Sequence, residues 1–191
     1  MEVLIISILS YLMGSVPFGF ILTKVFLKKD IRDIGSGNIG ATNALRAGNK
    51  SLGYGTLFLD IIKAIIPVVY VKLNYPDYIF IASLCVFLGH IFPIWLKFKG
   101  GKGVATYVGI LFSINLTISF VFIGVWFLTF LISKYSSLSS LLASLSIPIY
   151  LFFFTSQNLV FFSIMFILIF YTHRENVKRL KNKEESKTKI Y

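Results

Sequence analysis

The chain has 191 residues, of which 56% are hydrophobic and only 14% are charged, and its formal net charge is +11. A soluble domain carries about 25% charged residues, so this composition leaves too little polar surface to cover a water-soluble globule. It therefore argues against an ordinary soluble enzyme and predicts an all-α integral membrane protein. The one cysteine, Cys85, lies in an apolar run and cannot form an internal disulfide.

The first three apolar runs are each long enough for one transmembrane helix, which needs roughly 20 apolar residues. The N-terminal run spans residues 3–27 and is interrupted by Gly14 and Pro17 near its middle. It lacks the basic start and the cleavage site of a signal peptide, so we interpret it as a membrane span. The next two runs are residues 52–71 and 78–96.

Two longer apolar runs leave the number of spans open. Residues 104–132 contain no charge, and Ser113 and Asn115 mark a turn within them. Residues 141–171 are divided by the polar stretch 155–158. The chain has seven transmembrane helices if both runs are helical hairpins, and five if neither is. Either number is odd and places the two termini on opposite sides of the membrane.

Basic residues predict the orientation. Four polar segments hold 17 of the 19 Lys and Arg residues, namely 24–50, 97–102, Lys134 and 174–189. The positive-inside rule places these segments and the C-terminus in the cytoplasm, and the N-terminus outside. This asymmetry accounts for the net charge without nucleic-acid binding.

The first polar loop combines three glycines with neutral and cationic hydrogen-bond donors. Gly35, Gly37 and Gly40 allow backbone conformations in which successive N–H groups form an anion-binding concavity. Arg46 offers a guanidinium fork that suits phosphate. A flexible, solvated loop is the alternative interpretation. The neutral donors in this stretch are Ser36, Asn38, Thr42 and Asn43.

The second polar loop contains Gly100-Gly-Lys-Gly103 directly before an apolar run. A helix N-terminus at this point would attract an anion. The spacing differs from that of a Walker A motif, and a basic turn at the membrane surface is the alternative.

Four ionisable residues lie in or beside apolar runs. Asp60 and Lys63 are spaced to pair on one helix face. His90 and His173 each lie near the predicted cytoplasmic end of a span, where a histidine serves either structure or proton transfer. The scattered His and acidic residues show no metal-ligand spacing. After Lys134, one interpretation of four serines is that they cap the next helix: Ser136, Ser137, Ser139 and Ser140.

Five motifs occur in order along the chain. They are Gly14-Ser-Val-Pro-Phe-Gly19, residues 35–46, residues 89–106, the serines after Lys134, and His173-Arg-Glu-Asn176. In these motifs, and over essentially its whole length, the chain resembles the bacterial acyl-phosphate:glycerol-3-phosphate acyltransferases, the PlsY family. The resemblance implies a seven-helix acyltransferase domain over residues 1–176, followed by a basic tail, 177–191. The first motif either kinks its helix or shapes the acyl site.

The resemblance also implies the reaction. A fatty acyl group passes from acyl phosphate to the 1-hydroxyl of sn-glycerol 3-phosphate, giving lysophosphatidic acid and phosphate without a cofactor or an obligate protein partner. The expected place is the bacterial plasma membrane, with the site facing the cytoplasm. A histidine or a substrate phosphate oxygen accepts the hydroxyl proton. The implied catalytic residues are His90, His173, Asn176 and Ser36, and the implied phosphate ligands are Ser36, Asn38, Thr42, Asn43, Arg46, Lys99, Gly101, Lys102, Gly103 and Ser137.

Two other classes of protein share some of these features. A small organophosphate transporter would also cross the membrane several times and carry basic loops, but its polar groups would line a path to the other face. A scaffold that binds anionic lipid would not need the Gly-Ser-Gly-Asn loop with two histidines.

Overall fold

A computed structural model describes residues 1–46 and 49–188, and within these ranges every regular element is a helix. The predicted all-α class is therefore confirmed. The helices form two compact units, Met1–Ile114 and Asn115–Tyr191. Residues 189–191 of the predicted basic tail lie outside the described part of the chain.

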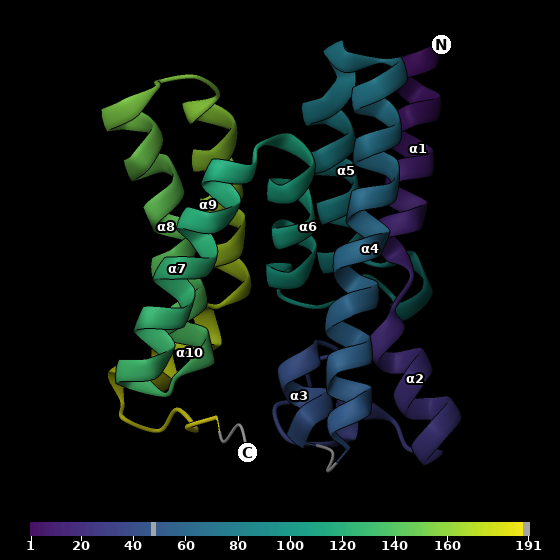
Figure 1. Cartoon of the computed structure of the whole chain (residues 1–191). Coiled ribbons are helices and arrows are strands. Elements are labelled where there is room, and N and C mark those ends of the chain that lie inside the picture. Colours follow the sequence, from purple (N-terminus) through teal and green to yellow (C-terminus); the bar gives the residue numbers. More distant parts are fainter. Residues whose placement is uncertain (47–48, 189–191) are drawn as a thin grey trace. The chain divides into compact units, whose positions relative to one another are not determined.

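The first unit is built around one long helix, α4 (Lys50–Asn74), which packs against α1, α2, α3, α5 and α6. Helix α1 also lies along α5 (Figure 1). Three short 3₁₀ turns, at Ile31–Asp33, Pro76–Tyr78 and Ile94–Leu96, lie between the helices. The other helices of the unit are α1 (Glu2–Ser15), α2 (Phe18–Leu27), α3 (Ala41–Arg46), α5 (Ile79–Ile91) and α6 (Val104–Ile114).

The break between α1 and α2 follows from one proline. Val16 precedes Pro17, and a residue before proline is driven out of the helical conformation. The carbonyl oxygen of Val16 accepts a hydrogen bond of 2.8 Å from Lys63 Nζ. Of the two interpretations of this motif, the structure supports the interruption of the helix.

Glycines allow the helices of this unit to approach closely. A Cβ atom on Gly14 would overlap the backbone of Val86, and one on Gly89 would overlap the carbonyl oxygen of Tyr11. These contacts bring α1 and α5 together, as small residues do at helix crossings in membranes.

The described residues of the second unit form four helices, whose boundaries confirm both predicted turns. Asn115 caps α7 by accepting hydrogen bonds from the backbone N–H groups of Thr117 and Ile118. Residues 155–158 separate α8 from α9. The bounds are α7 (Leu116–Ser133), α8 (Ser136–Phe154), α9 (Leu159–Thr172) and α10 (Arg174–Lys181). Helix α10 runs through residue 176, at which the sequence divides domain from tail.

The expectation that serines cap α8 is wrong. The helix begins without a side-chain cap. Ser139 and Ser140 instead donate to the carbonyl oxygens of Tyr135 and Ser136, four residues earlier. Such bonds satisfy a hydroxyl inside a helix in apolar surroundings.

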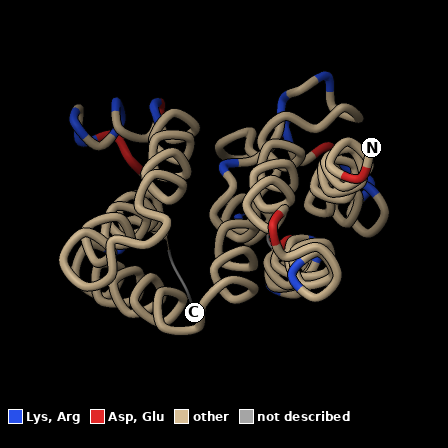
Figure 2. The backbone as a smooth tube through the Cα atoms, turned by 90° about the horizontal axis from the view of Figure 1, so that it is seen from above, with Lys and Arg blue, Asp and Glu red and all other residues tan. Residues whose placement is uncertain are grey.

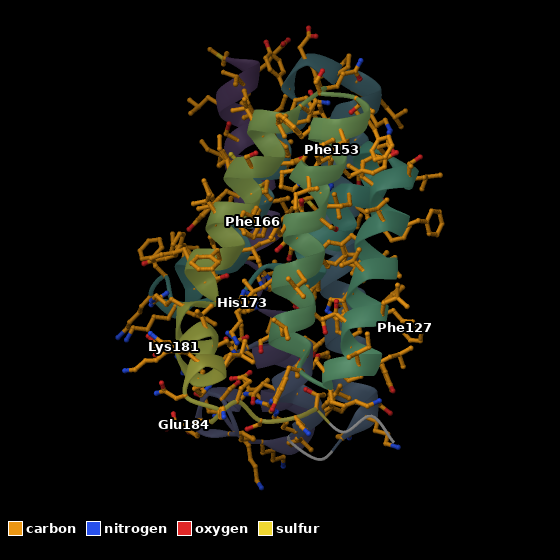
Figure 3. The ribbon with its side chains drawn as sticks, turned by 90° about the vertical axis from the view of Figure 1, so that its left-hand side faces the viewer. Phe127, Phe153, Phe166, His173, Lys181 and Glu184 are labelled. Carbon is orange, nitrogen blue, oxygen red and sulfur yellow. The ribbon has the colours of Figure 1, made fainter. Side chains whose placement is uncertain are left out.

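Several helices of the described chain are suited to a membrane by length and composition. Four segments qualify as candidate spans, and α6 and α9 are shorter apolar helices. Charged residues occupy short stretches of the chain, and most of the helical tube carries none (Figure 2). Exposed aromatic side chains such as Phe127 and Phe153 point outward from the second unit (Figure 3). The candidate spans are Glu2–Leu27, Pro76–Leu96, Leu116–Ser133 and Ser136–Phe154.

Candidate functional site

The first polar loop begins with a local ion pair. Asp30 caps the turn Ile31–Asp33 by accepting hydrogen bonds from the backbone N–H and the guanidinium of Arg32. These hydrogen bonds from Arg32 lower the pKa of Asp30 to about 2. The guanidinium also lies 5.1 Å from the centre of the Phe20 ring, which is a cation–π distance. Arg32 is thereby held against the first turn of α2.

Asn43 organises the same loop from inside. Its side chain is buried and its Oδ1 accepts a hydrogen bond of 2.9 Å from the Ser36 N–H. Its Nδ2 donates to the carbonyl oxygens of Ile31, Ile34 and Asn38 at 2.8–3.1 Å. Because the amide hydrogens already have acceptors, Asn43 holds the loop in shape.

The polar residues at the loop surface differ from Asn43 in exposure. Ser36 and Arg46 are exposed, and Asn38 and Thr42 are half-buried. Gly35 and Gly37 have positive φ values of 55° and 70°, as the sequence predicts, whereas Gly40 does not. The two left-handed glycines place Ser36 at the tip of the turn, where it can meet a ligand.

The second polar loop folds back onto the end of α5. Gly100 N–H donates to the Ile91 carbonyl oxygen at 3.2 Å, and Gly101 N–H donates to that of His90 at 3.1 Å. A Cβ atom on Gly101 would overlap the His90 ring. These glycines thus serve close packing, and their N–H groups bind α5 carbonyls. Lys99 is exposed, Lys102 is half-buried, and Gly103 is buried with φ of 84°.

The two polar loops meet within the first unit. Ile31, Ile39 and Ala44 of the first loop form one buried cluster with Leu96, in the turn Ile94–Leu96 that leads into the second loop. The structure therefore brings together two stretches that the sequence separates by about 50 residues. Ser36 and Arg46 of the first loop and Lys99 of the second are exposed.

A buried ion pair lies beside His90. Lys63 Nζ is 2.7 Å from Asp60 Oδ1, so the predicted pairing on one face of α4 is confirmed. His90 Nδ1 is 3.8 Å from the same oxygen, a proximity that the sequence did not reveal. All three side chains are at most 4% exposed. His90 thus lies between the ion pair and Gly101, well away from solvent.

His173 lies at the junction of α9 and α10 in the second unit (Figure 3). Its Nδ1 is 2.8 Å from the carbonyl oxygen of Ile169. A carbonyl accepts only, so Nδ1 carries the hydrogen and Nε2 is the basic nitrogen of the neutral ring. His173 thereby has the tautomer that a proton acceptor at Nε2 needs.

Asn176 and Ser137 meet at a carboxylate that was not predicted as a site residue. Glu185 Oε1 accepts hydrogen bonds from Asn176 Nδ2 at 2.7 Å and from Ser137 Oγ at 2.8 Å. Glu185 Oε2 accepts one from Arg179 Nε at 2.8 Å. Burial raises the pKa of Glu185, but the three donors outweigh it, so the pKa lies below its usual range. The position of Arg179 one turn after Asn176 was the signal that the sequence offered.

The chain is similar to known acyltransferases. A family model described as glycerol-3-phosphate acyltransferase matches residues 4–183. A Pelagibacter ubique protein named glycerol-3-phosphate acyltransferase is 77% identical over 191 residues, which cover 100% of this chain and 100% of that protein. One from Bradyrhizobium diazoefficiens is 48% identical over 182 residues, which cover 94% of this chain and 92% of that protein.

Two solved structures are also similar. A crystal structure of PlsY, described as an integral membrane glycerol 3-phosphate acyltransferase in its glycerol 3-phosphate form, has a TM-score of 0.93 and 35% identity. The match covers 98% of this chain and 96% of that one. The lysophosphatidic acid form of PlsY has a TM-score of 0.88, and the match covers 98% of this chain and 95% of that one.

Proposed function

The chain belongs to the glycerol-3-phosphate acyltransferase family that includes PlsY, and from this premise we propose the donor, the product and the site of its reaction. The donor is a fatty acyl phosphate, and the acceptor is the 1-hydroxyl of sn-glycerol 3-phosphate. The products are lysophosphatidic acid and inorganic phosphate. The glycerol 3-phosphate and lysophosphatidic acid forms of PlsY support the acceptor and the product.

The observation that carries the proposal is the meeting of two polar loops on one hydrophobic base. Exposed Ser36, Arg46 and Lys99 supply a hydroxyl and two cations there. Both substrates carry a phosphate group, and such donors stabilise phosphate by charge-assisted hydrogen bonds. The apolar helices provide a place for the acyl chain.

The chemistry needs no nucleophile from the protein. An acyl phosphate is a mixed anhydride, so the substrate hydroxyl attacks the carbonyl carbon and the bond to the phosphate oxygen breaks. The hydroxyl proton passes to a base, which is a histidine or a phosphate oxygen. His173 Nε2 supports the first route, because the Ile169 carbonyl fixes its tautomer. The protein contributes orientation and charge stabilisation.

We also propose seven transmembrane helices, with the N-terminus outside and the basic loops in the cytoplasm. The separation of α6 from α7 and of α8 from α9 supports seven over five. The concentration of Lys and Arg in four polar segments supports the orientation. The two polar loops of the first unit would then face the cytoplasm of a bacterial cell.

The decisive assay uses the purified protein in detergent with palmitoyl phosphate and glycerol 3-phosphate. We expect lysophosphatidic acid and inorganic phosphate in equal amounts. A folded protein that forms neither product would overturn the enzyme proposal. Uptake of glycerol 3-phosphate into liposomes without chemistry would support a transporter instead.

A further inference from the structure

Three side chains of the second unit hold the carboxylate of Glu185, and two backbone hydrogen bonds fix the chain beside it. Ser137 lies in the first turn of α8, whereas Asn176 and Arg179 lie on α10. The chain after α10 is fixed on both sides of Glu185. Glu184 N–H donates to the Arg179 carbonyl oxygen at 2.8 Å, and Thr188 N–H donates to that of Lys134 at 2.9 Å.

The three side chains form a cradle for an oxyanion. Ser137 and Asn176 are 7% and 3% exposed, so their donors are largely removed from water. A hydroxyl, an amide and a guanidinium all donate, and the guanidinium supplies positive charge. Two carboxylate oxygens present acceptors much as two phosphate oxygens do.

One buried oxygen atom of the cradle accepts no hydrogen bond. Within the described part of the chain, Asn176 Oδ1 has no hydrogen-bond partner. A buried carbonyl oxygen without a partner is costly, and a carboxylate cannot donate to it. A ligand that brings a hydroxyl or a protonated phosphate oxygen would satisfy this atom, whereas Glu185 does not.

We propose that Arg179 completes a phosphate-binding site with Ser137 and Asn176, and that Glu185 occupies this site until a substrate phosphate displaces it. The inference rests on the proposed function and adds to it Arg179 as a phosphate-binding residue and Glu185 as an internal competitor. The ligand class is a phosphate monoester or acyl phosphate. The tail therefore raises the apparent KM for that substrate without changing the chemical step.

The main experiment compares Glu185→Ala with Glu184→Ala in steady-state kinetics, varying each substrate separately. The two variants lose the same charge from adjacent tail positions, but Glu184 is exposed, and the cradle hydrogen bonds are made to Glu185. If the tail occupies the site about nine-tenths of the time, Glu185→Ala lowers one KM about tenfold at constant kcat. Glu184→Ala leaves both KM values unchanged.

The substrate whose KM falls identifies the phosphate that binds there. A fall for glycerol 3-phosphate assigns the acceptor, and a fall for palmitoyl phosphate assigns the donor. Unchanged KM values for Glu185→Ala would overturn the competition. If the wild-type protein itself forms no lysophosphatidic acid, the proposed function fails rather than this inference alone.

The role of Arg179 is tested in the Glu185→Ala background, which lacks the carboxylate that Arg179 contacts. Adding Arg179→Lys to Glu185→Ala should raise the same KM about tenfold or more, because lysine loses the fixed guanidinium geometry. An equal KM in the single and double variants would remove Arg179 from the substrate site.

A second measurement uses the wild-type protein and does not depend on any variant. Trypsin cleaves after Lys183 and Lys187, which flank Glu185. Glycerol 3-phosphate, palmitoyl phosphate or inorganic phosphate should speed this cleavage by releasing the tail, with sodium chloride of equal ionic strength as the control. Cleavage that none of the three phosphates accelerates would overturn the displacement.

Discussion

Arg46 is the exposed cation at the end of α3, beside the loop that we assign to phosphate binding. Hydrogen bonds to charged groups contribute about 1.5–3 kcal/mol, so Arg46→Ala should raise the KM for glycerol 3-phosphate roughly 10- to 100-fold. Lys29→Ala, which removes another exposed cation before the same loop, should change it little. Near-normal turnover of Arg46→Ala at low substrate would refute the assignment.

Gly101 shows how one missing side chain shapes the second loop. A Cβ atom there would overlap the His90 ring, so Gly101→Ala should lower the free energy of unfolding by about 1–3 kcal/mol through overpacking. Gly124 in α7 is the comparison, because a methyl group there would meet no neighbouring side chain or helix within 4 Å. Gly124→Ala should leave the free energy of unfolding unchanged or raise it by up to about 1 kcal/mol. Thermal unfolding in detergent measures both. Equal effects would contradict this explanation of the loop.

Among the elements, α4 contributes the buried pair of Asp60 and Lys63. Removing one partner of a buried ion pair leaves an uncompensated charge, so Lys63→Met should cost about 3–5 kcal/mol of stability. The double variant Asp60→Asn with Lys63→Met should recover much of this loss, because no buried charge remains. Chemical unfolding in detergent measures the cycle.

Lys72→Met is the matched control on the same helix. Lys72 is exposed and donates to the Ser113 carbonyl oxygen, so this substitution should cost only about 1 kcal/mol. A double variant as unstable as Lys63→Met would show that the Lys63 bond to Val16, rather than charge pairing, dominates.

The contact between α10 and the tail should depend on pH. The pKa of Glu185 is lowered from 4.5, so docking is fully stable above about pH 4.5 and is lost as the pH falls through the docked pKa. A spin label at Glu184→Cys, in a Cys85→Ser background, should stay immobilised from pH 5 to 8 and become mobile in acid. Mobility that changes between pH 6 and 8 instead would contradict the role of this carboxylate.

For the whole molecule, the sequence predicted features that depend on local order along the chain. Asn115 and residues 155–158 interrupt apolar runs, and the structure ends helices there. The pairing of Asp60 with Lys63 follows from their spacing on one helix. These predictions were accessible because helix ends and spacing along a helix are short-range properties.

The remaining features depend on contacts between residues far apart in the sequence. Glu185 meets Ser137 across 48 positions, which no local pattern reveals. The N–H groups of Gly100 and Gly101 were expected to be open to an anion, but the end of α5 accepts their hydrogen bonds. A glycine-rich loop has the same sequence whether it packs tightly or binds a ligand, so only the structure separates the two roles.

The arrangement of the whole chain in the membrane can be decided by cysteine labelling in a Cys85→Ser background. With seven spans, Asp77→Cys and Gln157→Cys react with an impermeant thiol reagent in intact cells, because both exposed positions would lie outside. Lys187→Cys reacts only after lysis, because the basic tail would be cytoplasmic. With five spans, position 157 would lie inside the bilayer and stay unlabelled. Labelling of Lys187→Cys in intact cells would reverse the orientation and remove the cytoplasmic site.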